Sequence, residues 1–201
     1  AAFIGFGANV MAQNPEYYND FAGNSNNSFP LNTTSSNKVQ WIYAPTVFNS
    51  NGSTGDPAPS GYISHVYFKI GSANTSASYT NFTISLGQNQ GTNSTWSSGT
   101  FVTGLTECFN QSGYSLTGAT SGNWYGVELT TPFQYNPALA LVFEMKVSGG
   151  TGNTVAQVNN SGQNQRIWGV YASSTGSTGT GLVSFGIDVS YAAVPNNAGI
   201  T

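Results

Sequence analysis

The sequence predicts an all-β protein: an antiparallel β-sandwich or jelly roll with an extended N-terminal strand. No long stretch repeats its apolar residues with the helical period of 3.6, whereas short apolar runs rich in β-branched and aromatic residues recur along the chain. Clusters of Gly, Asn, Ser and Pro separate these runs. With 38% hydrophobic and 13% aromatic residues among 201, the chain can bury a core and does not fit the disordered class.

Nine runs are predicted as strands, and polar, turn-rich stretches lie between them. The predicted strands cover residues 39–43, 62–70, 81–86, 100–103, 124–129, 139–147, 154–158, 166–171 and 182–190. The run 62–70 is apolar on both faces, which predicts a central strand. The predicted loops are 49–61, 88–99, 149–153 and 173–181, and residues 14–37 are predicted to connect the N-terminal segment to the sandwich.

Alternation within the runs predicts which side of each strand is buried. In the run 139–147, the side predicted to face the core carries Leu141, Phe143, Met145 and Val147, and the side predicted to face water carries Val142, Glu144 and Lys146. The same pattern assigns to the core Val39, Trp41, Tyr43, Val183, Phe185, Ile187 and Val189. Trp124 and Trp168 also lie in strands and are predicted to be core residues. Cys108, the only cysteine, is predicted to be a small buried hydrophobe and excludes an internal disulfide framework.

The first thirteen residues, AAFIGFGANVMAQ, carry no charge and alternate with a period of two. They end in a small-residue pattern typical of a signal-peptide cleavage site, but alternation is typical of a half-buried strand. The apolar even positions are Ala2, Ile4, Phe6, Ala8, Val10 and Ala12. We therefore divide the chain into an N-terminal strand and arm, residues 1–20, and a β-sandwich domain, residues 21–201.

Such a strand needs a sheet, and three explanations are open. It pairs within its own sandwich, it is added to the sandwich of a neighbouring copy, or it is a remnant of processing. It has no charge or proline that would prevent pairing at a sheet edge.

Charge excludes several function classes. Only 5% of the residues are Asp, Glu, Lys or Arg and the net charge is −3, against roughly 25% charged residues in an average soluble domain. Four basic residues cannot neutralise a row of phosphates, so nucleic acid is not expected as a partner. No apolar run is long enough to span a bilayer. A neutral surface of amides and hydroxyls favours association between copies and predicts an extracellular or cell-surface assembly.

The sequence offers little for catalysis, and we expect no enzyme, no cofactor and no metal site. His65 lies within a predicted strand without a nucleophile motif nearby, which favours a structural role. One His and one Cys exclude an ordinary zinc site. A hydrolase would need paired carboxylates, for which Glu107, Glu128 and Glu144 are the candidates, but we expect them to be solvated or ion-paired.

A carbohydrate-binding or adhesive module is the alternative function. Trp96, in a predicted loop, and Tyr17 and Tyr18 are candidate glycan contacts if their rings are exposed. Glycans attached to the chain itself are a separate matter. Acceptor triplets for N-glycosylation occur at Asn26, Asn32, Asn51, Asn74, Asn81, Asn93, Asn110 and Asn159.

Several stretches resemble a β-sandwich module of secreted surface proteins of Bacteroidetes and related bacteria, which are often exported by the type IX route. The similar stretches are NKVQWIYAP, GYISHVYFKIG, YTNFTISLGQ, GNWYGVELTTPFQYNPALALVFEM and RIWGVYASSTG, and they cover most of residues 37–190. The most specific is WYGVELTTPFQYNP, where the resemblance implies a strand, a Thr-Pro-Phe turn and a second apolar strand. The MAQNPEYYND junction is also similar to signal-peptide boundaries in such proteins.

The resemblance implies a β-sandwich with no catalytic residues, in a mostly uncharacterised family of adhesive or accessory modules. Such modules usually belong to long multidomain proteins. With its N-terminal arm, this chain is expected instead to be a freestanding structural subunit that polymerises with itself in a pilus-like filament or surface matrix.

Overall fold

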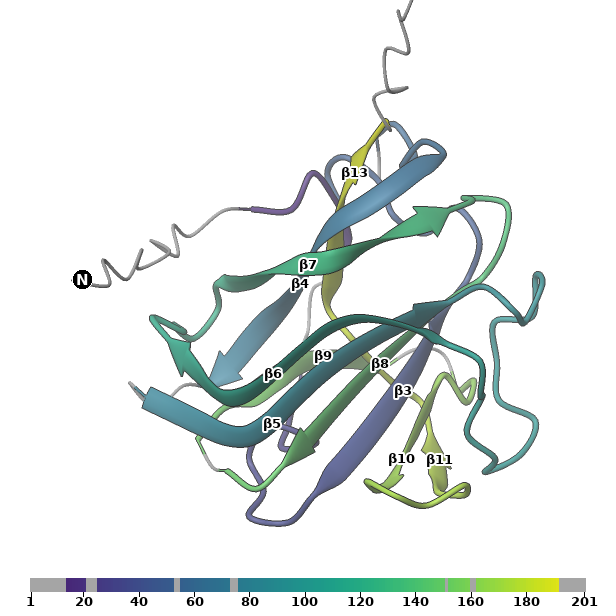
Figure 1. Ribbon diagram of the computed structural model, residues 1–201. Helices are drawn as coiled ribbons and strands as arrows, with labels where there is room; N and C mark the ends of the chain where they lie inside the picture. Colours follow the sequence, from purple (N-terminus) through teal and green to yellow (C-terminus); the bar gives the residue numbers. More distant parts are fainter. Residues whose placement is uncertain are drawn as a thin grey trace, which may run out of the picture.

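The computed structural model describes residues 14–20, 25–52, 55–72, 76–150, 152–159 and 162–191. Their strands form two antiparallel sheets that face each other, so the predicted β-sandwich is confirmed (Figure 1). The predicted strand over residues 2–12 lies outside the described residues.

The first sheet has seven strands, and β4 is its centre. β4 pairs with β13, β7 and β9, which confirms the central strand predicted over residues 62–70. β1 pairs with β13, and both β2 and β12 pair with β9. The bounds are β1 Tyr17–Asn19, β2 Ser25–Asn27, β4 Gly61–Ser72, β7 Trp124–Tyr135, β9 Thr154–Asn159, β12 Gly181–Val183 and β13 Phe185–Ser190.

The second sheet has six strands in the order β11-β10-β3-β8-β5-β6. The bounds are β3 Asn37–Tyr43, β5 Ser76–Gly87, β6 Thr106–Thr117, β8 Leu141–Ser148, β10 Arg166–Val170 and β11 Ser177–Gly179. β6 therefore forms one edge of this sheet and β11 the other.

Aromatic rings from both sheets meet in the core. The ring of Phe185 on β13 stacks between Tyr43 on β3, at 5.2 Å between centroids, and Phe143 on β8, at 4.2 Å. Trp41 stacks on Phe143 in turn, at 5.4 Å. The alternating residues predicted to face the core in these strands are buried, and so is Cys108. Trp168 is partly buried and packs against this core, whereas Trp124 is half-buried and does not belong to it, so the prediction of a core residue was wrong for Trp124.

Three predictions about the elements were wrong. Residues 14–37 contain β1 and β2, which pair with the sandwich, so this segment is part of the sheets and the sandwich begins before residue 21. Residues 100–103 form no strand; the strand follows them, as β6. The run 182–190 is interrupted at Ser184. Its N–H donates to the carbonyl of Ala156 on β9, whereas its own carbonyl accepts from the N–H of Lys69 on β4, so the chain changes its pairing partner from β9 to β4 at this residue.

The outer face of the six-stranded sheet is covered by residues 96–105. Here Trp96 and Phe101 pack on Ile42, Val142 and Ile167 in a second apolar cluster. Val142 is fully buried and Glu144 is 6% exposed, so the prediction that this side of β8 faces water was wrong for both residues. Lys146 on the same side is half-buried.

Candidate assembly interface

The described chain begins along one edge of the seven-stranded sheet. The N–H of Glu16 donates to the carboxylate of Asp188 at 2.8 Å, and the side-chain oxygen of Asn19 accepts from the N–H of Phe185 at 2.9 Å. Gly186 has no side chain, and a Cβ there would lie 2.4 Å from the ring of Pro15. These contacts fix residues 15–19 along β13, so the place where the N-terminal segment joins the body is defined.

A row of paired residues leads from this point across the sheet. Tyr17 lies opposite Ile187, Ile187 opposite Val66, and Val66 opposite Val127. Since neighbouring strands are about 4.8 Å apart, about 14 Å separates β1 from β7. β7 is therefore on the side of the sheet opposite to the arm.

The edge strands of the two sheets differ sharply in length. β1, β2, β11 and β12 have three residues each, whereas β6 and β7 have twelve each. Within the described ladders, β6 pairs only with β5, and β7 only with β4. Short strands are a common protection against edge-to-edge pairing, so the two long edges are the ones that this protection does not cover.

These two long edges lie on the same side of the sandwich and face each other (Figure 1). Between them is a groove of about 530 Å³. Its walls are formed by residues 125–130 of β7 and by Phe109, Gln111, Tyr114, Ser115 and Thr117 of β6. Glu128 is the one charged residue in this lining.

The floor of the groove is aromatic and continuous with the core. The hydroxyls of Tyr114 and Tyr125 lie 3.2 Å apart, which joins the two edges. Tyr114 stacks on Phe82 with 4.5 Å between ring centroids, and Tyr125 packs against Phe68 at 5.5 Å. A segment lying in the groove would therefore contact the cores of both sheets.

β7 departs from regular pairing at the Thr-Pro-Phe sequence. Glu128 pairs with His65 and Phe133 with Ile63, so residues 129–132 lie opposite Ser64 alone. The predicted turn after residue 129 was wrong, because the strand continues through this irregularity to Tyr135. Proline is tolerated there because β7 is an edge strand.

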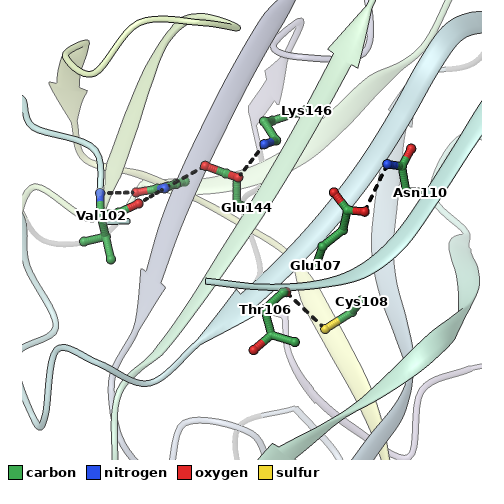
Figure 2. Close-up of polar contacts among 8 residues, drawn as sticks. Val102, Thr106, Glu107, Cys108, Asn110, Glu144 and Lys146 are labelled. Carbon is green, nitrogen blue, oxygen red and sulfur yellow. Dashed lines mark hydrogen bonds and ion pairs between the residues drawn. The ribbon is translucent and has the colours of Figure 1, made fainter. Parts of the chain in front are cut away.

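Of the three glutamates considered for catalysis, two lie beside the same hollow and the third lies on the other sheet. Figure 2 shows Glu144 directed toward Lys146 and Glu107 directed toward Asn110. Both line a hollow of about 260 Å³ beside residues 102–105. Glu128 belongs to the other sheet, so the structure brings together Glu107 and Glu144 only.

Hydrogen bonds within the protein explain how the Glu144 carboxylate can be buried. Gln40 donates to its carboxylate at 2.7 Å, and the same amide exchanges two bonds with the backbone of Val102, at 2.8 and 2.9 Å. Lys146 Nζ lies 3.5 Å from the carboxylate. Burial lowers the pKa of Lys38, whose ammonium lies 4.1 Å from the ring centroid of Phe101. These contacts tie the covering segment 96–105 to the sheet.

His65 lies in a cross-strand row between two carboxylates. It pairs with Asp188 on β13 and with Glu128 on β7. The half-buried ring has its Nδ1 3.2 Å from the Ser64 hydroxyl. Asp188 also accepts a bond from the Tyr67 hydroxyl at 2.6 Å, which occupies that carboxylate structurally.

The residues considered as glycan contacts are less exposed than expected. Trp96 is 6% exposed within the second apolar cluster, so the expectation of an exposed ring was wrong. Tyr17 and Tyr18 are half-buried in β1, and the ring of Tyr18 lies edge-on to Trp124 at 5.5 Å.

The candidate glycosylation sites are distributed over both sheets and several loops. The exposed ones are Asn26, Asn32, Asn51, Asn93 and Asn110. Asn81 on β5 is half-buried, whereas Asn74 and the side chain of Asn159 lie outside the description.

No protein-family model and no curated protein matches this sequence. Within the described ranges, no three side chains of His, Cys, Asp or Glu gather as metal ligands. No helix in the same part of the chain has the length and apolar character needed to cross a membrane.

The sequence reasoning missed the groove. β6 was not predicted, because the stretch TECFNQSGYSLT is mostly polar and only Cys108 and Leu116 are buried. The sequence signal that could have indicated β6 is the alternation of apolar and polar residues around Tyr114, in an uncharged run that follows Glu107.

Proposed function

We propose that the protein is the structural subunit of an extracellular filament or surface matrix. In the assembly, residues 2–12 of one copy are added as a β-strand to the sandwich of the next. The protein acts through burial and backbone pairing, without chemistry on a substrate.

The observation that carries the proposal is the combination of an unassigned strand pattern with two sheet edges that are not protected by being short. The segment 2–12 has the alternation of a strand, and two edge strands of twelve residues each have a ladder partner on one side only among the described strands. Strand addition would give the segment a sheet and the edge strands a second partner, since an exposed edge pairs readily with an extended segment.

The energies are adequate for a stable contact. Burial of Ile4, Phe6 and Val10 contributes roughly 1.5–3 kcal/mol for each side chain. Each added backbone hydrogen bond contributes about 1 kcal/mol net. The cost of ordering the arm offsets part of this gain, and the uncharged segment brings no charge that must lose its water.

The proposed location rests on the surface chemistry. A surface built from amides and hydroxyls gives little repulsion between copies, which suits permanent assembly outside the cell. The resemblance to secreted surface modules agrees with this location and stays a prediction.

Deletion of residues 1–12 tests the function. The truncated protein should remain folded by circular dichroism and sediment as a monomer, while the intact chain forms larger species. As a matched pair, Phe6→Asn should abolish assembly because it changes the apolar even side, and Met11→Gln on the odd side should preserve it.

Fibres formed by the truncated protein would refute strand donation. A truncated chain that fails to fold would show that the segment completes its own sheet.

A further inference from the structure

The structure points to a single acceptor for the arm. We propose that residues 4–10 of a neighbouring copy lie in the groove between β6 and β7 and pair with both edges, an inference that rests on the proposed function. The inserted strand would join the two sheets on the side of the sandwich where the edges face each other.

The lengths of the edge strands favour this groove as the acceptor. At β1, β2, β11 and β12, an added strand could pair with only three residues. β6 and β7 have twelve each, of which residues 129–132 of β7 are irregular and the carbonyl of Cys108 on β6 already accepts from the Thr130 hydroxyl. Residues 125–130 of β7 line the groove over about 17 Å, the length of six extended residues, so it holds most of the seven-residue segment 4–10.

The side chains of the segment suit the two surfaces that it would meet. With Ile4, Phe6, Ala8 and Val10 directed inward, apolar groups cover the floor formed by Tyr114 and Tyr125. The intervening Gly5 and Gly7 add no bulk on the outer side. An uncharged segment also meets a lining whose one charge, Glu128, is exposed and can stay in water.

The length of the N-terminal arm favours insertion into the groove of a neighbouring copy over insertion into the groove of the same copy. A strand beside β7 lies about 19 Å from Tyr17, four strand spacings along the paired row. The seven steps from Val10 to Tyr17 reach at most about 25 Å when fully extended. Since Pro15 and Glu16 are held along β13, insertion into the chain's own groove leaves almost no slack.

Cysteine cross-linking between full-length copies tests the site. One variant carries Ala8→Cys, and a second carries Gln111→Cys, at an exposed groove position of β6 opposite the core residue Phe82; both have Cys108→Ala. Mixed, co-assembled copies should form a disulfide-linked heterodimer on oxidation. The matched control is Ser177→Cys, which is exposed on the short edge β11 and should give no product.

A second variant pair tests the groove without cross-linking. Ser115→Arg introduces a large charged side chain into the groove and should cause loss of assembly with an unchanged circular dichroism spectrum. Ser177→Arg, equally exposed on β11, should assemble normally.

The outcomes separate the two proposals. Cross-links from position 8 to Ser177→Cys but not to the groove variant, with normal assembly of Ser115→Arg, would refute the groove while strand donation stands. An intrachain disulfide in the double variant Ala8→Cys, Gln111→Cys, with no product between copies, would refute both.

Discussion

At the scale of single residues, Gln40 organises a buried polar site on the six-stranded sheet. Its amide is fully buried and bonds both to Glu144 and to the backbone of Val102. A buried carboxylate is costly unless it is paired and hydrogen-bonded. Gln40 and Lys146 provide these partners for Glu144, and through the Gln40 amide the site also holds the covering segment at Val102.

Replacement of Gln40 by alanine should therefore destabilise the protein by about 2–4 kcal/mol, because it removes the hydrogen-bond donor to the buried Glu144 carboxylate and the acceptor of the Val102 N–H. Urea unfolding followed by tryptophan fluorescence measures the change. Asn110→Ala removes an exposed bond to Glu107 and should change stability by about 0.5 kcal/mol or less. Equal effects of the two substitutions would contradict this role of Gln40.

At the scale of elements, the segment 96–105 decides how far the sequence could predict the fold. Strict alternation placed the inner faces of β3, β8 and β13 correctly, because a strand has only two sides. The outer face was misjudged, since nothing local to β8 tells that a distant loop covers it. Ile42, Val142 and Ile167 share that outer face and were an unused signal for a second apolar cluster.

The edge strands β6 and β1 show the same limit of prediction from local sequence, because neither was recognised as a strand. An edge strand buries few residues, and its identity depends on a partner that lies far away in the sequence, so local pattern is weak. The groove depends on where β6 and β7 come together. It could therefore be found only after the topology was known.

Trp96→Ala tests the covering segment. Loss of a buried tryptophan side chain from this cluster should destabilise the protein by about 3–5 kcal/mol. Chemical unfolding of the variant beside Ser97→Ala, an exposed neighbour, gives the comparison. A Trp96 variant as stable as the Ser97 variant would mean that the segment does not stabilise the sheet.

At the scale of the whole molecule, uncharged polar residues take the place of charged ones. The chain has four basic and seven acidic residues, so salt should affect its assembly little. Aromatic burial dominates instead, and it brings tyrosine hydroxyls into the core. Burial raises the pKa of Tyr43 well above its usual range and that of Tyr135 to about 12.

Alkaline pH should therefore destabilise the fold. An unfolded tyrosine ionises near pH 10, so between about pH 10 and 12 the folded state binds more protons than the unfolded state and stability falls as pH rises. Urea midpoints at rising pH measure this loss. Tyr135→Phe should lessen the decrease, and a midpoint that stays constant above about pH 10 would contradict the burial of these hydroxyls.

Electron cryo-microscopy of assembled filaments tests the central claim most directly, because it shows whose sheet holds residues 2–12. The account predicts that this segment of one subunit runs as an extended strand within the sandwich of the next, with Ile4, Phe6 and Val10 directed into that neighbour's core. A map in which the segment lies in the sandwich of its own subunit, with copies meeting only through surface side chains, would contradict the account.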